Sequence, residues 1–342
     1  MTVPMHIVLA HGGGGQLSME LIEEVILPIL GGQDPQGLTD AARLELPGGR
    51  YAFTTDSYVV QPLEFPGGDI GKLAVCGTIN DLAVSGARPV ALSMALVLEE
   101  GLEIELLRRV LASAAGAARA AGVGIVTGDT KVVERRPGAA QPGLTINTAG
   151  IGAVLDGAHL AFDRVEEGDA IVLSGPLGEH GMAVMGQRKG LAIASDLVSD
   201  CASIAPLTEA LIAELGPAVR WMRDPTRGGL AATLSELSAA TRRNLEIDQR
   251  SIPVDPTAAG AAEILGLDLL SVANEGKLVA VVAADAGECA AGVLADYEIA
   301  ARAAVIGRVG ARADLPLVEM VTRAGGRRVV QMPYGEDLPR IC

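Results

Sequence analysis

The sequence has 342 residues, of which 49% are hydrophobic and only 2% aromatic, and its formal net charge at pH 7 is −15. This length allows two domains, whose cores must be built from aliphatic side chains. The acidic charge argues against a nucleic-acid partner, and no apolar run reaches the length of a membrane span. No basic segment followed by an apolar one opens the sequence, so we expect a cytoplasmic protein.

The chain begins with a glycine run and a helical pattern. The run includes Gly13 and Gly14, whose backbone N–H groups could approach an anion, although a flexible linker is the alternative. Apolar residues at helical spacing over 22–30 predict a helix, which Ser18 would cap and two glycines would end.

The remainder of the first half mixes strands and helices. We expect strands over 50–60, 90–98, 123–127 and 144–154, and helices over 69–85 and 103–121. Neighbouring strands are not always separated by a helix, which favours an α+β fold over a doubly wound sheet. Asn80 and Asp81 lie within the first of these helices, although both are poor helix formers, so their presence requires another reason.

The second half has a similar size and content, with no direct repeat of the first. We expect strands over 170–174, 277–283 and 304–309, and helices over 207–215 and 286–297. A glycine-punctuated loop should contain Glu179 and His180. A further helix should open at Gly228, directly after Arg227, where its N–H groups would face an anion.

The sequence ends on a cysteine. Cys342 follows a segment, 332–341, that contains two prolines and few residues able to pack, and we expect this tail to be mobile. A thiolate is a good nucleophile, and a thiol on such an arm could be carried between active sites. A frayed terminus without function is the alternative.

Several charged residues are suited to binding a magnesium–nucleotide complex. Carboxylates that converge on one place hold Mg²⁺, and lysines neutralise phosphates. The candidate ligands of the metal are Asp56, Asp69, Asp81 and Asp129. Lys72 and Lys131 are the candidate cations. Any one of these aspartates alone could be a cap or turn residue, but together they predict a site for ATP and Mg²⁺ without a Walker or kinase motif.

Five segments carry a specific resemblance. They are residues 68–82 (GDIGKLAVCGTINDL), 127–133 (TGDTKVV), 224–229 (DPTRGG), 274–276 (NEG) and 339–342 (PRIC). The first resembles the superfamily of aminoimidazole ribonucleotide synthetase, selenophosphate synthetase and thiamine-monophosphate kinase. The full set resembles the HypE family of [NiFe]-hydrogenase maturation factors, over essentially the whole chain.

The resemblance implies an ATP-dependent carbamoyl dehydratase. In that family a carbamoyltransferase, HypF, loads the terminal cysteine, and ATP drives the loss of water from the carbamoyl group to leave an S-cyano group. The cyanide passes to iron held on the HypC–HypD complex. The family fold, which resembles that of PurM, the aminoimidazole ribonucleotide synthetase, implies an ATP-binding domain over 1–154, a second α+β domain over 155–331 and a tail over 332–342. The first sheet would form a barrel across a homodimer.

The resemblance also implies roles for individual residues. Cys342 would carry the carbamoyl group, Lys131 would stabilise its activated form and Glu275 would be the general base. The nucleotide would be bound by Gly13, Gly14, Asp56, Lys72, Asn80, Asp81, Thr130, Arg227 and Gly228. A surface lysine and a turn carboxylate are the alternatives for Lys131 and Glu275. We treat His180, Cys76, Cys201 and Cys289 as structural.

Two other functions stay open at this stage. A related enzyme could use ATP to phosphorylate a small molecule, and it would not need Cys342. Alternatively, the tail could be a docking peptide on a nucleotide-sensing module without turnover. The acidic charge further predicts that binding to a basic partner weakens as salt rises.

Overall fold

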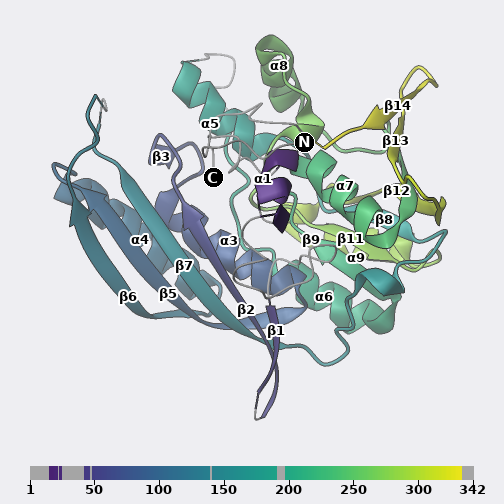
Figure 1. Ribbon diagram of the computed structural model, residues 1–342, viewed down its shortest axis with the longest axis horizontal. Helices are drawn as coiled ribbons and strands as arrows, with labels where there is room; N and C mark the ends of the chain where they lie inside the picture. The colour runs from purple at the N-terminus through teal and green to yellow at the C-terminus, as the bar shows by residue number, and fades with distance from the viewer. Residues whose placement is uncertain are drawn as a thin grey trace.

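The computed structural model describes residues 15–21, 23–24, 42–46, 48–138, 141–190 and 197–332. In these ranges two large sheets lie side by side, each with helices packed against it (Figure 1). A short hairpin, β3 (Glu64–Phe65) and β4 (Gly68–Asp69), forms a separate two-stranded pair. No helix within the described ranges is long and apolar enough to cross a membrane.

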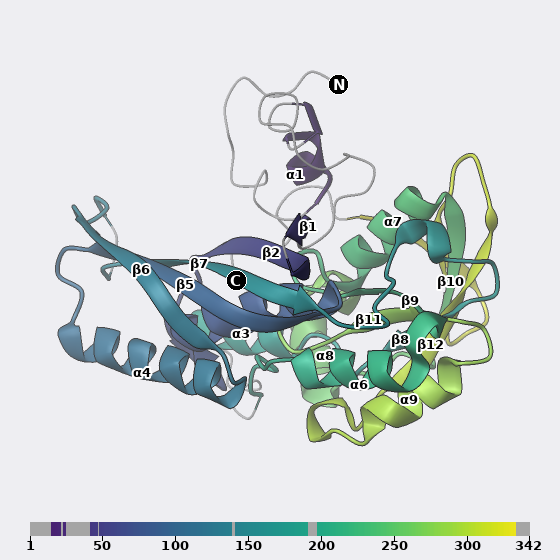
Figure 2. The ribbon, with the colours of Figure 1, turned by 90° about the horizontal axis from the view of Figure 1, so that it is seen from below.

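The first sheet has the strand order β1-β2-β7-β5-β6. Its strands are β1 (Ala42–Leu46), β2 (Gly49–Tyr58), β5 (Ala87–Glu99), β6 (Gly124–Val133) and β7 (Leu144–Val154). Neighbours pair antiparallel except β5 and β6, which are parallel because α4 (Ile104–Ala120) makes the crossover between them. This helix and α3 (Ile70–Val84) cover one face of the sheet (Figure 2).

The second sheet has the order β14-β13-β10-β12-β8-β11-β9. Its strands are β8 (Ala170–Leu173), β9 (Val219–Arg223), β10 (Arg243–Asp248), β11 (Val279–Val282), β12 (Ala304–Arg312), β13 (Val318–Val321) and β14 (Arg327–Val330). The central strands β8 and β11 are buried on both faces. One face packs on α7 (Gly229–Thr241), and the other packs on α6 (Ala205–Leu215) and α9 (Gly287–Ala295). The resulting three layers explain the aliphatic composition of these strands.

One apolar core joins the two halves of the sequence. It contains the buried face of α3 together with residues of α5 (Glu179–Lys189) and α8 (Pro256–Leu265), and it extends to Val272 and Ala273. In this region α8 packs on α5, α5 packs on β3, and α6 packs on α3, so elements of the second half contact the first half. The loops between the sheets are held in place by this shared core.

Most of the expected elements are present, and the exceptions have physical reasons. Glu179 and His180 open α5 instead of lying in a loop, because Gly178 turns the chain at φ 87° just before them. The strand expected to end at Thr127 continues to Val133, because β5 supplies partners along its whole length. Ser18 lies inside α1 (Gln16–Leu21) and does not cap it, and most of the helix expected over 22–30 falls outside the described residues.

Candidate active site

The first turn of α3 shows what Asp69 and Lys72 do in the fold. The backbone N–H groups of Gly71 and Lys72 donate to Asp69 Oδ1 at 2.7 and 3.0 Å, so Asp69 caps the helix. The Lys72 Nζ donates to the carbonyl of Gly67 at 2.9 Å. The geometry thus gives Asp69 the capping role that was the alternative to metal binding.

The polar end of α3 ties the two sheets together. Asn80 is 1% exposed, and its Nδ2 donates to the carbonyls of Ala202 at 3.0 Å and Glu275 at 3.3 Å. Its Oδ1 accepts from the N–H of Ile204 at 2.9 Å. The neighbouring Asp81 accepts a hydrogen bond from Thr54 Oγ1 at 2.8 Å. The interactions of Asn80 and Asp81 with other elements offset the poor helix propensity of these residues.

Glu275 lies buried where these loops meet. Glu275 is only 3% exposed, and its Oε1 has no hydrogen-bond partner among the described residues. Burial raises the pKa of Glu275 well above its ordinary value, and the nearby carboxylates of Asp224, Asp200 and Asp56 raise it further, while Arg227 opposes them. A carboxyl group in such an environment is a suitable general base, because it takes a proton readily once ionised.

Tyr58 marks the point where three of the carboxylates gather, and the sequence reasoning did not single it out. Burial raises the pKa of its hydroxyl, and the charges of Asp56, Asp81 and Glu275 raise it further. The ring packs on α3 so closely that a Cβ at Gly77 would lie 2.1 Å from the hydroxyl. The available signal was strand alternation, which places Tyr58 on the same face of β2 as Asp56.

The start of α7 provides an anion-binding geometry. Gly228 and Gly229 have φ of 73° and 59°, and a Cβ at Gly229 would lie 2.6 Å from the carbonyl of Leu270. Glycine is therefore required at this close approach. The first N–H groups of the helix receive no side-chain cap from the described residues, and the exposed Arg227 immediately precedes them. These groups are suited to a phosphate.

The Gly-Asp-Thr-Lys segment lies elsewhere, on the edge strand β6. Asp56 is aligned with Thr148, Met94 and Gly128 across four strands, so Asp129 lies about 14 Å away at roughly 4.8 Å per strand. Asp129 lies one residue beyond Gly128, which is the residue aligned with Asp56, so its side chain faces the opposite side of the sheet from that of Asp56. The expectation that Asp56 and Asp129 converge is wrong within one subunit, because two ligands of one Mg²⁺ must lie within about 4 Å of each other.

Lys131 is likewise on this outer edge. Its side chain is 66% exposed, and its Nζ forms an ion pair with Asp129 at 2.8 Å. The ammonium group lowers the pKa of the Asp129 carboxyl. Within one subunit the structure therefore separates Lys131 and Thr130 from Glu275, contrary to the expectation of a single cluster.

Asp56 and Asp81 are the carboxylates that remain as candidate ligands of Mg²⁺. No group of three or more His, Cys, Asp or Glu side chains in the described ranges could hold a metal ion without other ligands. Mg²⁺ usually takes one or two carboxylates and completes its shell with phosphates and water. Asp56 and Asp81 supply oxygen donors of the right kind for that arrangement.

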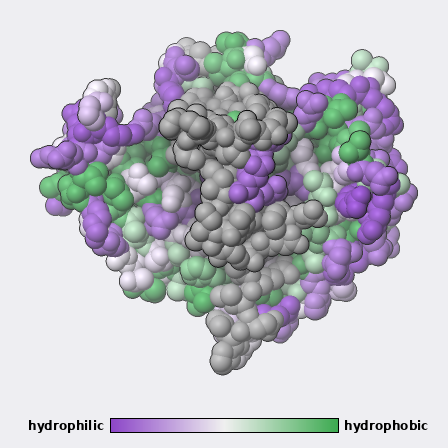
Figure 3. Space-filling model, in the orientation of Figure 1, coloured by the Kyte–Doolittle hydropathy of each residue, from purple (hydrophilic) through white to green (hydrophobic). Residues whose placement is uncertain are grey.

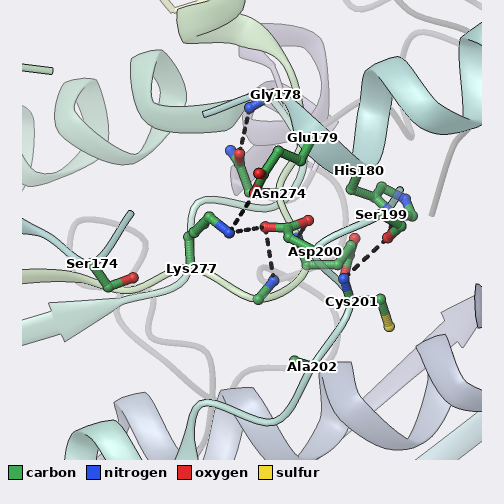
Figure 4. A network of polar contacts seen from close by, with 12 residues as sticks. Ser174, Gly178, Glu179, His180, Ser199, Asp200, Cys201, Ala202, Asn274 and Lys277 are labelled. Carbon is green, nitrogen blue, oxygen red and sulfur yellow. Dashed lines mark hydrogen bonds and ion pairs between the residues drawn. The ribbon is translucent and has the colours of Figure 1, made fainter. Parts of the chain in front are cut away.

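The other residues of interest are structural or lie outside the described ranges. His180 is buried, and its Nδ1 lies 2.8 Å from Ser199 Oγ (Figure 4). Cys76 and Cys201 are buried, whereas Cys289 is exposed. The positions of Cys342, Gly13 and Gly14 are not described.

Comparisons with known proteins agree over the full length of the chain. Residues 38–154 match the N-terminal domain of the AIR synthase related proteins, and residues 166–318 match the C-terminal domain. These matches define the class of protein, a two-domain α+β protein with the fold of the AIR synthase superfamily. The carbamoyl dehydratase HypE of Rhodobacter capsulatus is 50% identical over 98% of both chains.

Solved structures give the same result. The chain resembles a HypE in complex with ATP at a TM-score of 0.80 and 44% identity, covering 98% of this chain and 100% of that one. It resembles the HypE of a HypE–HypF complex at a TM-score of 0.84 and 42% identity, covering 92% and 99%. The chain belongs to the HypE family of carbamoyl dehydratases, which mature hydrogenases. The alternative of another small-molecule enzyme of the superfamily is not favoured.

Proposed function

We propose that this protein removes water from a carbamoyl group carried on its own Cys342, at the expense of ATP. The observation that supports this most directly is the buried carboxyl of Glu275, which gathers with Asp56 and Asp81 around Tyr58. The chemistry needs a base in a dry site, together with a place for phosphates. Family membership supports the same activity, because the R. capsulatus relative is a carbamoyl dehydratase and a HypE structure contains ATP.

The proposed dehydration takes place in two steps, the transfer of a phosphoryl group and the loss of phosphate. The γ-phosphoryl group is transferred to the carbamoyl oxygen, and one N–H proton leaves as the C=N bond forms. Phosphate then departs with the C–O bond as the second N–H proton is taken, which leaves a thiocyanate, S–C≡N. An amide oxygen cannot leave unless it is phosphorylated, so ATP is consumed to make it a leaving group. Glu275 would take one of these protons.

Individual residues would bind the phosphates. The N–H groups at Gly228 and the guanidinium of Arg227 would neutralise phosphate oxygens, together with Lys72 and the backbone of Gly13 and Gly14. Asp56 and Asp81 would hold Mg²⁺, which supplies Lewis acidity and offsets charge on the phosphates. Asn80 would contribute indirectly, because its amide already links α3 to Glu275.

A homodimer would complete the site. The sheet face opposite α3 and α4 exposes apolar side chains of Phe53 and Val97, and hydrophobic residues gather at the left of Figure 3. In the described part of the chain, β6 pairs only with β5, so one edge of it is open. We propose that two such sheets form a barrel, which would place Asp129, Thr130 and Lys131 of a second copy beside Glu275 of the first.

The wider assignment follows from the family. One neighbour forms a HypE–HypF complex, so we propose a HypF-type carbamoyltransferase as the partner that loads Cys342, and a HypC–HypD complex as the cyanide acceptor. We propose that the protein works in the cytoplasm. We divide the chain into an ATP-binding domain, 1–154, a second domain, 155–331, and a tail, 332–342.

The test is the mass of the C-terminal peptide. The chain is loaded by its carbamoyltransferase and incubated with and without Mg-ATP, and Cys342→Ser is the control. The expected result is a peptide that gains one carbamoyl group and then loses one water only with ATP. Loading without loss of water would make the chain a carrier alone, and an unmodified Cys342 would overturn the proposal.

A further inference from the structure

A segment between the two sheets is fixed on both of its sides. Residues 197–202, here called the linking segment, precede α6 and lie between the β3–β4 turn and the loop at Glu275; Figure 4 shows Ser199 to Ala202 of this segment. The N–H of Ser199 donates to the carbonyl of Pro66 at 2.8 Å, and the N–H of Ala202 donates to the carbonyl of Glu275 at 3.3 Å. A Cβ at Gly67 would lie 2.8 Å from the backbone of Ser199, so this contact is close.

Asp200, within the linking segment, contacts three consecutive residues of the loop. Its Oδ1 accepts from the N–H of Glu275 at 3.1 Å, and its Oδ2 accepts from the N–H of Gly276 at 3.3 Å. The same Oδ2 lies 3.1 Å from the Nζ of Lys277, and the Asp200 side chain is only 3% exposed. A Cβ at Gly276 would lie 1.9 Å from the carbonyl of Asp200. This close contact requires glycine at 276, and the two hydrogen bonds to Asp200 fix the backbone on both sides of the Glu275 side chain.

An ion pair is buried at this place. Lys277, 4% exposed, also forms an ion pair with Glu179 at 2.8 Å, as Figure 4 shows. One ammonium group therefore faces two carboxylates, the buried Asp200 and Glu179, whose side chain is 23% exposed. Burying ionised groups is costly, and apolar residues of similar volume usually serve stability as well or better. The buried Asp200–Lys277 pair therefore calls for a reason other than stability.

Asp200 acts on Glu275 together with other titratable neighbours. The groups close to the Glu275 carboxyl are Asp200 and Cys201 from the linking segment, Asp224 and Arg227 from the loop before α7, and Asp56 and Tyr58 from β2. Asp224, Asp200 and Asp56 disfavour its ionised form, and Arg227 favours it. Asp200 differs from the other two carboxylates because it also holds the Glu275 backbone.

We propose that Asp200 is a positioning residue for the dehydration, which fixes the peptide groups on both sides of Glu275 and places a negative charge beside its carboxyl. The proposal rests on the proposed function for its catalytic meaning. Asp200 itself has no contact with the reacting atoms. It aims the carboxyl of Glu275 and makes that carboxyl a stronger base once it is ionised.

The variant Asp200→Asn keeps the shape and removes the charge. Its matched control is Asp255→Asn, because Asp255 Oδ1 also accepts two backbone N–H bonds, from Thr257 and Ala258 at 2.8 and 3.0 Å, at the start of α8. The rate of water loss is measured on the loaded full chain against pH. We expect a plateau rate roughly tenfold lower for Asp200→Asn, from weaker hydrogen bonds to an uncharged acceptor, and an acidic limb moved to lower pH, because Glu275 then ionises more easily.

A second measurement does not depend on the reaction. The effect of Glu275→Gln on urea unfolding is measured against pH, with and without Asp200→Asn. At alkaline pH the gain in stability from Glu275→Gln should be smaller when Asp200→Asn is present, and the pH at which that gain levels off should fall, because the folded-state pKa of Glu275 is then lower. Asp255→Asn should change neither quantity. An unchanged gain and an unchanged levelling pH in this cycle overturn the inference even if the enzyme is active. A parent chain that never loses water overturns the proposed function alone, while a shift in the cycle still supports the coupling of Asp200 to Glu275.

Discussion

The amide of Asn80 offers the sharpest test of how the two halves are held together. In Asn80→Ala, the N–H of Ile204 and the carbonyl of Ala202 lose the partner that the structure gives them inside the core. An unsatisfied buried backbone group costs about 1–3 kcal/mol, so the two together cost about 2–6 kcal/mol. Alanine recovers a few tenths of a kcal/mol through its better helix propensity. We expect a net loss of about 2–5 kcal/mol in the free energy of unfolding.

Urea unfolding followed by circular dichroism measures this loss, and two further variants make it specific. Asn80→Asp keeps an acceptor for Ile204 but places a carboxylate oxygen against the two carbonyls, so its loss should be at least as large. Asn244→Ala removes a single exposed bond to the N–H of Leu317 and should cost less than about 1 kcal/mol. Equal losses for Asn80→Ala and Asn244→Ala would refute the view that the amide links the halves.

Three further predictions concern the site. Gly276→Ala should destabilise by about 1–3 kcal/mol because its Cβ meets the carbonyl of Asp200, whereas Gly260→Ala in α8, where the space is open, should be neutral or stabilising in the same thermal melts. The folded-state pKa of Glu275 is raised above 4.5, so the free energy of unfolding falls as pH rises from 4.5 through that folded pKa. In urea unfolding, Glu275→Gln should therefore be more stable than the parent near about pH 8 and equal to it near about pH 4. Lys131→Ala and Glu275→Gln should each be inactive alone. When subunits of the two variants are mixed and reassembled, half of the dimers contain one intact site, so about a quarter of the sites should regain activity. No recovery of water loss would show that one site does not combine Glu275 of one subunit with Lys131 of the other.

Local patterns were sufficient for much of the fold. The helix expected over 69–85 agrees with α3, which is capped by Asp69 and ends before Ser85, although the cap was only the alternative to a metal-binding role for Asp69. Asn80 and Asp81, which are unusual residues within a helix, correctly indicated contacts with other elements. Glu179 and His180 were misassigned because a glycine that precedes a helix in the left-handed conformation looks, in sequence, like a glycine within a loop.

The arrangement of the site depended on pairings that no local pattern shows. Asp56 lies within a strand-like run and Asp129 follows one, but β7 and β5 lie between their strands in the sheet. The strand β7 is formed from residues later in the chain than either aspartate. The contacts of Asp200 with Glu275 and of Tyr58 with Gly77 join residues far apart in sequence. Sequence alone therefore identified the chemistry of the carboxylates better than their distances.

The shared core has a consequence for biosynthesis. Val272 and Ala273 belong to the same apolar cluster as α3, so the helical face of the first half stays incomplete until the ribosome has made both residues. Until then the nascent chain exposes α3 residues such as Leu73 and Ile79, which are fully buried in the finished protein. The N-terminal half thus emerges first but completes its core late, and transiently exposed apolar surface of this kind makes a folding chain prone to aggregation.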